Sequence, residues 1–221
     1  KIIKQALQVI EERRCHSCHV IDGQGGYIKN RQELSKKEFS HLLPPSLDGE
    51  GDMVQPQWLF SFLKDPTPVR PWLTIRMPTF AFQDNEVEAL VQFFSLSSGR
   101  ETLFDAEENR GDDKKEIESG KQIFTLLKCD SCHGGKTNGK MKPGDIGPDL
   151  SLAKHRLRAK WVKRWLEDPM SIKKGTRMPT NWIKVQRRGK TRYILPPSLQ
   201  SILGGDVKKQ ISAVTAYLLT L

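Results

Sequence analysis

The feature that constrains this chain most is the pentapeptide Cys-x-x-Cys-His, which occurs twice, at residues 15–19 and 129–133. A cysteine pair at this spacing, followed at once by histidine, is typical of covalent haem attachment: both thiols form thioethers to the porphyrin, and the histidine reaches the iron. The two copies use all four cysteines, so none is left for a structural disulfide. The attachment residues are therefore Cys15, Cys18, Cys129 and Cys132, followed by His19 and His133, and two haems are expected.

Two other chemistries also use Cys-x-x-Cys pairs. A tetrahedral zinc site would bring the pairs together, but residue 129 lies 114 positions after residue 15, and each pair has a histidine directly behind it. A thioredoxin-like motif sits at a strand-to-helix turn of a βαβ unit. Both motifs here follow a helical pattern, and no parallel-sheet signal is present. Haem attachment is the better interpretation of both.

The chain repeats well beyond the cysteines. Apolar residues at helical spacing precede each motif, over residues 2–14 and 115–128. Ala6 and Gly120 each lie nine positions before the first cysteine of their motif. A small residue at the same place in both helices predicts the close approach of another helix.

The residues after each motif repeat as well. A polar, glycine-rich stretch leads to Pro-x-Leu, and a tryptophan follows the leucine by eleven residues in both halves. Each tryptophan helix ends at Asp-Pro, because proline cannot continue a helix. An Arg-Met-Pro-Thr string and a closing amphipathic helix complete each half. The matching segments are 45–47 and 148–150, 58–66 and 161–169, 76–79 and 177–180, and about 86–97 and about 206–221.

This order of elements resembles class I cytochrome c, twice over, across residues 1–97 and 115–221. The resemblance implies an all-α chain of two tandem class I cytochrome c domains, a diheme cytochrome c, with an acidic linker at residues 98–114. Each domain would enclose one haem c, and its first and last helices would cross at the small residue.

His19 and His133 are the expected proximal iron ligands by position. Among five methionines, Met77 and Met178 alone occupy the same place in both repeats, so we expect them to be the sixth ligands. His/Met ligation raises the reduction potential and fills the coordination sphere. The other methionines are expected to fill gaps in the core; they are Met53, Met141 and Met170.

The resemblance also implies that a proline carbonyl accepts a hydrogen bond from Nδ1 of each proximal histidine, which fixes its tautomer. Those prolines are Pro45 and Pro148, although Pro44 competes with Pro45 for the role in the first half. Trp58 and Trp161 are expected to form walls of the haem pockets. The remaining histidines are weaker ligand candidates; they are His16, which we expect to face solvent, His41 and His155.

The net charge of +10 is unevenly distributed along the chain. Residues 1–100 carry 12 Lys and Arg against 12 Asp and Glu, residues 101–120 carry 3 against 8, and residues 121–221 carry 21 against 6. A basic cytochrome surface steers an acidic redox partner and makes the encounter rate salt-dependent. We therefore expect an acidic redox protein to dock on the second domain. Contact with anionic lipid is an alternative, and nucleic acid is disfavoured for a haem protein.

Two further segments bear on docking. The acidic linker is expected either to fold back on the basic domain or to remain a solvated tether. After Met178 the second half is longer than the first, and residues 182–186 and 191–195 alternate around a basic turn, which predicts a small β-hairpin insertion. We expect this hairpin to shape the partner contact; a surface loop without such a role is the alternative.

Covalent haem attachment of this kind requires export, so an extracytoplasmic, periplasmic location is expected. The chain begins at Lys1 without an initiator methionine or a signal peptide, and contains no stretch of about 20 apolar residues. We therefore expect that a leader has been removed or that the sequence is part of a longer chain. Membrane association would then depend on a partner or on an anchor outside the sequence.

The sequence thus predicts an electron carrier rather than an enzyme, with two His/Met haems that relay electrons between redox proteins. Two alternatives stay open. One is a permanently bound cytochrome subunit of a respiratory membrane complex, with the same relay chemistry. The other is a diheme peroxidase, which needs a displaceable ligand on one iron; the matching methionines in both halves argue against it.

Overall fold

The structure is a computed structural model that describes residues 1–30, 42–104, 113–134, 136–137, 140–141, 147–187 and 189–221. The chain forms two compact units. One contains Lys1–Pro68 and Leu73–Ala106, and the other contains Val69–Trp72 and Glu107–Leu221. Each unit carries one Cys-x-x-Cys-His motif.

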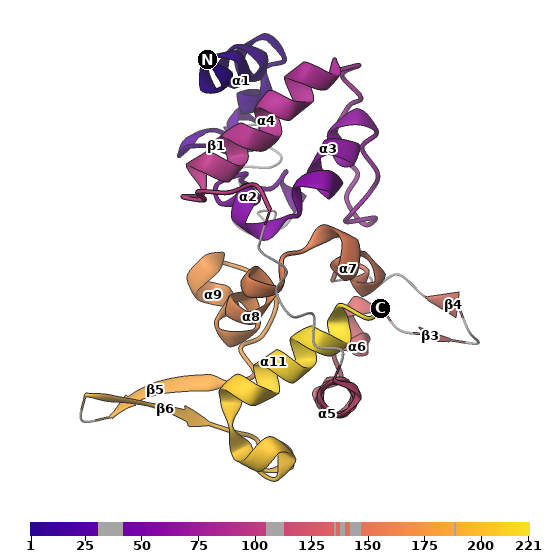
Figure 1. The fold of residues 1–221 in the computed structure, drawn as a ribbon, viewed down its shortest axis with the longest axis vertical. Helices are drawn as coiled ribbons and strands as arrows, with labels where there is room; N and C mark the ends of the chain where they lie inside the picture. The colour runs from indigo at the N-terminus through magenta and orange to yellow at the C-terminus, as the bar shows by residue number, and fades with distance from the viewer. Residues whose placement is uncertain (31–41, 105–112, 135, 138–139, 142–146, 188) are drawn as a thin grey trace. The chain divides into compact units, whose positions relative to one another are not determined.

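The first unit is built on helix α4, against which α1, α2 and α3 pack (Figure 1). Ala6 and Ile10 of α1 are buried against the cluster that contains Val87, Leu90 and Phe94 of α4. The elements of this unit are α1 (Ile2–Glu12), η1 (Cys15–Ser17), β1 (Val20–Ile21), β2 (Gln24–Gly25), η2 (Tyr27–Asn30), α2 (Glu50–Met53), α3 (Pro56–Lys64) and α4 (Asp84–Ser97).

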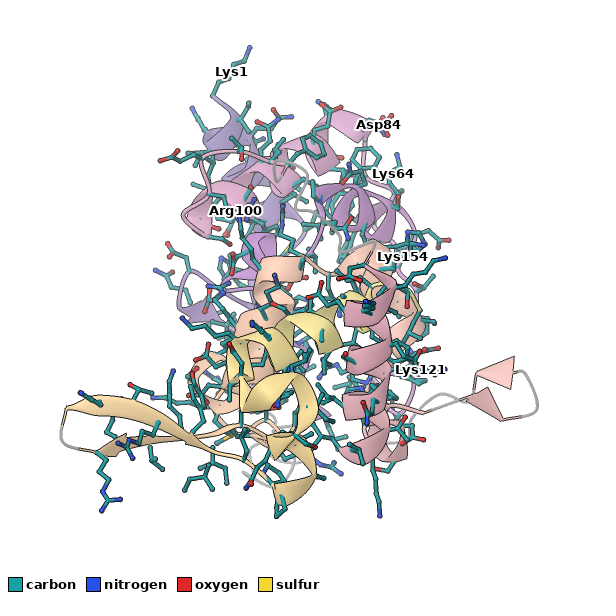
Figure 2. All side chains as sticks on the ribbon, turned by 60° about the horizontal axis from the view of Figure 1, so that its bottom comes forward. Lys1, Lys64, Asp84, Arg100, Lys121 and Lys154 are labelled. Atoms are coloured by element: carbon teal, nitrogen blue, oxygen red, sulfur yellow. The ribbon has the colours of Figure 1, made fainter. Side chains whose placement is uncertain are left out.

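Helix α4 starts at a capping box. The backbone N–H of Gln83 donates to Glu86 Oε2 at 2.7 Å, and the Gln83 side chain accepts from the backbone N–H of Glu86. The acidic residues in its first turn also suit the positive end of the helix dipole. Lys64, the last residue of α3, pairs with Asp84 at 2.6 Å, which joins the two helices (both residues are labelled in Figure 2).

The second unit is built on the crossing of α5 and α11 (Figure 1). A Cβ at Gly120 would overlap the backbone carbonyl of Ala213, so glycine permits the close approach expected there. The elements are α5 (Lys114–Leu126), α6 (Asp130–His133), β3 (Lys136–Thr137), β4 (Lys140–Met141), η4 (Leu150–Leu152), α7 (Ala153–Arg156), α8 (Ala159–Glu167), α9 (Pro169–Ile172), β5 (Ile183–Arg187), β6 (Lys190–Ile194), α10 (Pro197–Gln200), η5 (Ile202–Gly205) and α11 (Val207–Leu218).

The mainly helical architecture agrees with the fold class expected from the sequence. The tryptophan helices start two residues before their tryptophans, and both end just before Asp-Pro. Two very short antiparallel ladders, β1–β2 and β3–β4, follow the motifs and were not expected. In the first, Asp22 and Gly23 have φ of 53° and 71°, as a two-residue type I′ turn requires.

The expected hairpin insertion is present as the antiparallel pair β5–β6, which extends outward from the helices of its unit (Figure 1). Trp182 is not part of the ladder. It is fully buried, and its Nε1–H donates to Oε1 of the equally buried Gln210 at 3.0 Å. The Gln210 amide donates in turn to two carbonyls, those of Leu199 and Ile202. The insertion is thus anchored in the core at its base.

Part of the expected linker packs on the first unit. Leu103 lies against the first core cluster, and Arg100 Nη1 lies 3.9 Å from Asp52 Oδ1. Residues 105–112 lie outside the described part of the chain. No helix among the described residues is long and apolar enough to cross a bilayer.

Candidate haem sites

The backbone makes a similar tight turn at the two motifs, a 3-10 helix over Cys15–Ser17 and a short α-helix over Asp130–His133. The residue before each first cysteine, Arg14 or Lys128, has a left-handed φ of 53°. From there the chain turns tightly: the N–H of His19 donates to the Cys15 carbonyl at 2.9 Å, and the N–H of His133 to the Cys129 carbonyl at 3.1 Å. Each turn therefore holds both cysteines and the histidine together.

Each motif histidine is held by a proline carbonyl. His19 Nδ1 lies 2.8 Å from the Pro45 oxygen, and His133 Nδ1 lies 2.9 Å from the Pro148 oxygen. Because a carbonyl oxygen can only accept, Nδ1 carries the proton in both rings. The lone pair is then on Nε2, the nitrogen that can coordinate a metal. In the first half the partner is Pro45 and not Pro44.

A glycine lies beside the second histidine. A Cβ at Gly147 would lie 2.7 Å from His133 Nδ1 and 2.8 Å from Cε1. The imidazole therefore occupies space that any larger residue would need, which explains the Gly-Pro of this half. In the first half Pro44 stands at the place of Gly147, directly before Pro45.

All four cysteines are half-buried and form no disulfide. Burial raises the pKa of the Cys15 thiol. Burial, together with the nearby Asp130 carboxylate, raises the pKa of Cys129 to about 11. Both thiols are therefore protonated at neutral pH.

The two candidate sixth ligands, Met77 and Met178, are half-buried, and each packs against the core of its own unit. Trp58 stacks on Phe62, with ring centroids 4.7 Å apart and planes at 18°. Trp161 stacks in the same way on Trp165, at 5.1 Å and 12°.

Trp165 also contacts Met178 directly. Its Nε1–H donates to the Met178 Sδ, with nitrogen and sulfur 2.8 Å apart. Neither Trp165 nor Phe62 was singled out in the sequence. Their position one helical turn after Trp161 and Trp58 was the available signal, because residues four apart share a face of a helix.

The remaining candidates are spread over the two units. Met53 is half-buried against the first core, and Met170 is 47% exposed. His155 is exposed, while His16 is half-buried with Nδ1 3.2 Å from the Gln24 carbonyl, so it does not simply face solvent as expected. Met141 lies in β4, and His41 lies outside the described residues.

The residues present in each half fit a covalent haem. Each half offers two thiols, an imidazole with its lone pair on Nε2, a thioether, and a stacked aromatic pair that an apolar cofactor would cover further. Across the described part of the chain, no three His, Cys, Asp or Glu side chains gather as they would around a bare metal ion.

Comparison with known proteins gives one result. Residues 117–221 match the family model of cytochrome c. The match supports a cytochrome c domain there. It starts in α5, runs to the last residue and includes Cys129, Cys132 and His133. Searches of curated proteins and of solved structures return no match.

The family match supports covalently bound haem c, electron transfer in general and an extracytoplasmic location. The first motif lies outside the matched range, so a haem in the first half depends on the geometry shared by the two halves.

Proposed function

We propose that this protein is a diheme electron-transfer cytochrome with two His/Met-ligated haems. The observation that carries the proposal is the duplicated hydrogen bond from Nδ1 of the motif histidine to a proline carbonyl, at 2.8 Å in one half and 2.9 Å in the other. In both halves this bond leaves the Nε2 lone pair of the histidine available to a haem iron.

The protein residues have four tasks in this proposal. Cys15 and Cys18, like Cys129 and Cys132, anchor the porphyrin edge. His19 and His133 present Nε2 to the iron, and the carbonyls of Pro45 and Pro148 hold the rings in the required tautomer. Met77 and Met178 would supply the thioether ligands, and Trp58 and Trp161, which pack against the two cores, would line the pockets. Each bound haem would supply reversible one-electron ferric/ferrous chemistry.

The test is haem stoichiometry in the full chain, produced in a host that attaches haem c. Intact-mass measurement should show two covalent haems. The double variant Cys15→Ala with Cys18→Ala should carry one haem, and so should Cys129→Ala with Cys132→Ala. One haem on the unaltered chain, lost only in the second double variant, would contradict the diheme proposal and leave a single cytochrome domain.

The ligand assignment is tested separately by absorption spectra. Met77→Ala and Met178→Ala should each convert one low-spin haem to a form that binds added imidazole. If the unaltered protein already shows a high-spin haem and turns over peroxide, the diheme peroxidase is the better interpretation.

We further propose that the second half docks an acidic redox protein through the β5–β6 hairpin. Residues 121–221 carry 21 Lys and Arg against 6 Asp and Glu. The described residues of the hairpin include no acid, and side chains ending in nitrogen stand out along it (Figure 2). On one face of the ribbon, exposed Ile183 and Ile194 lie opposite each other at the base. Towards the tip, the exposed cations of that face are Arg187, Lys190 and Arg192.

Like charges directly opposite each other destabilise a ladder, and Arg187 pairs with Lys190. A cationic tip above an apolar base fits a partner with an apolar contact patch and an acidic rim.

The docking test is charge reversal at these three cations to glutamate, with Lys1, Lys4 and Lys29 of the first half reversed as a control of equal charge. We expect slower electron transfer to an acidic blue-copper protein and a flatter salt dependence in the hairpin variant alone. Equal slowing in both variants would contradict a hairpin docking surface. Hairpin-dependent binding to anionic vesicles, without any effect on the copper protein, would favour the lipid alternative.

The location that this function requires is the periplasm or an equivalent extracytoplasmic space, because haem c is attached after export. The same chemistry would serve a respiratory chain, with this protein as a free carrier or as a bound subunit. Co-purification of the chain with a membrane complex from its native source would favour the bound subunit.

A further inference from the structure

The two halves differ at the candidate sixth ligand, and the difference is one indole nitrogen. Trp58 and Trp161 are the third residues of α3 and α8, and the fourth residue after each is Phe62 or Trp165. Both pairs stack at similar distance and tilt, 4.7 Å and 18° against 5.1 Å and 12°. The second ring therefore has the same place in each half, but only Trp165 carries an N–H.

That N–H points at the sulfur of Met178. Nε1 lies 2.8 Å from Sδ, and the contact is partly buried. An indole nitrogen can only donate, and a thioether sulfur can accept. A partly buried indole N–H also normally finds an acceptor. A phenyl ring has no N–H, so Phe62 cannot make this bond in the first half.

We propose that Trp165 is a positioning residue that holds the Met178 thioether and sets the second haem at a higher reduction potential than a phenylalanine would. The inference rests on the proposed function, because it requires Met178 to be the iron ligand. A thioether sulfur has two lone pairs, so one can bind the iron while the other accepts the indole proton. The hydrogen bond withdraws electron density from the sulfur, and the more electron-demanding ferric state loses more from this than the ferrous state. Outer hydrogen bonds are a general means of tuning a bound metal.

The decisive variant is Trp165→Phe, which gives the second half the residue of the first. The hydrogen bond is present in both oxidation states, so only the difference between its ferrous and ferric strengths moves the potential. Its loss should raise the ferric-to-ferrous ratio of the second haem at a fixed electrode potential by a few-fold and by no more than about tenfold, where tenfold corresponds to about 59 mV for one electron. The first haem in the same molecule is the internal control and should not shift. Potentials are read by spectroelectrochemical titration.

Met178→Ala separates the two ways in which the inference can fail. If Met178→Ala leaves the second haem spectrum unchanged, Met178 is not a ligand and the proposed function is wrong on that point. If Met178→Ala alters the spectrum but Trp165→Phe leaves the potential of the second haem where it was, the inference on Trp165 is wrong and the ligand assignment stands.

A second measurement does not depend on the variant folding. In the unaltered holoprotein labelled with ¹⁵N-tryptophan, the Trp165 indole N–H should be protected from hydrogen exchange in both oxidation states. An unprotected indole N–H would overturn the inference, because a proton held between nitrogen and sulfur cannot exchange freely.

Discussion

The ends of the two tryptophan helices, α3 and α8, show how the halves of this chain differ. The nine-residue helices match position by position, yet α3 ends in Lys64 and α8 ends in Glu167. Lys64 pairs with Asp84, the first residue of α4, at 2.6 Å. Glu167 instead accepts from Lys184 at 2.9 Å and from the Tyr193 hydroxyl at 2.6 Å, and both donors belong to the hairpin.

The opposite charge at one repeated position therefore redirects the contact from the closing helix to the insertion. The bonds of each motif histidine to its proline carbonyl and to the carbonyl of the first cysteine are, by contrast, the same in both halves and nearly equal in length. The two halves therefore share the geometry of the haem-attachment motif. They differ in the side chains around Met77 and Met178 and in the contacts at the ends of α3 and α8.

The largest effect should come from exchanging the small residues at the helix crossings. Gly120→Ala should lower the free energy of unfolding of the second unit by about 3 kcal/mol, because its Cβ would meet the Ala213 backbone. Ala6→Gly should cost the first unit only about 1 kcal/mol, the usual helix penalty for glycine. Urea unfolding of the full chain measures both. Lys121→Ala, an exposed neighbour on α5, is the control and should change stability by less than about 0.5 kcal/mol.

Gly147→Ala should cause the next largest loss in the free energy of unfolding. The added carbon must push the His133 ring aside and break its bond to Pro148, at a cost of about 2 kcal/mol. Pro44→Ala, at the matching place in the first half, should change stability by no more than about 1 kcal/mol, chiefly through the unfolded chain. Thermal unfolding and haem content give the two readouts. Equal losses in both variants would mean that the halves do not differ here.

Trp182→Phe tests the anchor that only the second half has. The change removes the donor to Gln210 Oε1 and leaves a buried oxygen without that bond, so we expect a loss of about 1–2 kcal/mol. The second single variant is Gln210→Leu, at the other end of the bond. Together with Trp182→Phe and the double variant it forms a double-mutant cycle. If the two losses are simply additive, the hydrogen bond is not what anchors the hairpin.

Glu167→Lys should give the smallest effect and makes the second half resemble the first. The Tyr193 hydroxyl and Lys184 lower the pKa of Glu167, so the folded state favours its carboxylate. The contribution to stability is therefore full above the usual glutamate pKa of about 4.3 and is lost as the pH falls through the lower pKa of the folded state. The hairpin should loosen at neutral pH in the variant, and in the unaltered protein only in acid.

The loosening of the hairpin is measured by backbone amide exchange in β6 at neutral pH. The pH dependence of stability is measured by thermal unfolding of both proteins between pH 3 and pH 7. The stability difference between the two proteins should shrink below about pH 4. A difference that stays constant with pH would show that the Glu167 carboxylate is not responsible. Lys64→Glu, the reverse exchange in the first half, is the matched variant.

From the sequence alone, the order of the helices and the cysteines and histidine of each motif could be predicted. These features depend on local spacing: helical periodicity, Asp-Pro ends, and a five-residue motif whose chemistry demands adjacent residues. The proline carbonyls were implied by the resemblance to class I cytochrome c, and ligation by Met77 and Met178, expected from the repeat, stays a prediction. The hairpin insertion was also visible as a period-two pattern, although Trp182 proved to belong to the core.

Features that depend on how distant residues meet could be read only from the folded chain. The left-handed Arg14 and Lys128 leave no signature, because non-glycine residues seldom adopt that φ and any side chain can be the exception. The choice of Pro45 over Pro44, the contact between Trp165 and Met178, and the switch of Glu167 to the hairpin depend on loop paths and side-chain packing. These contacts join residues 13 to 26 positions apart, a separation at which sequence spacing no longer fixes distance.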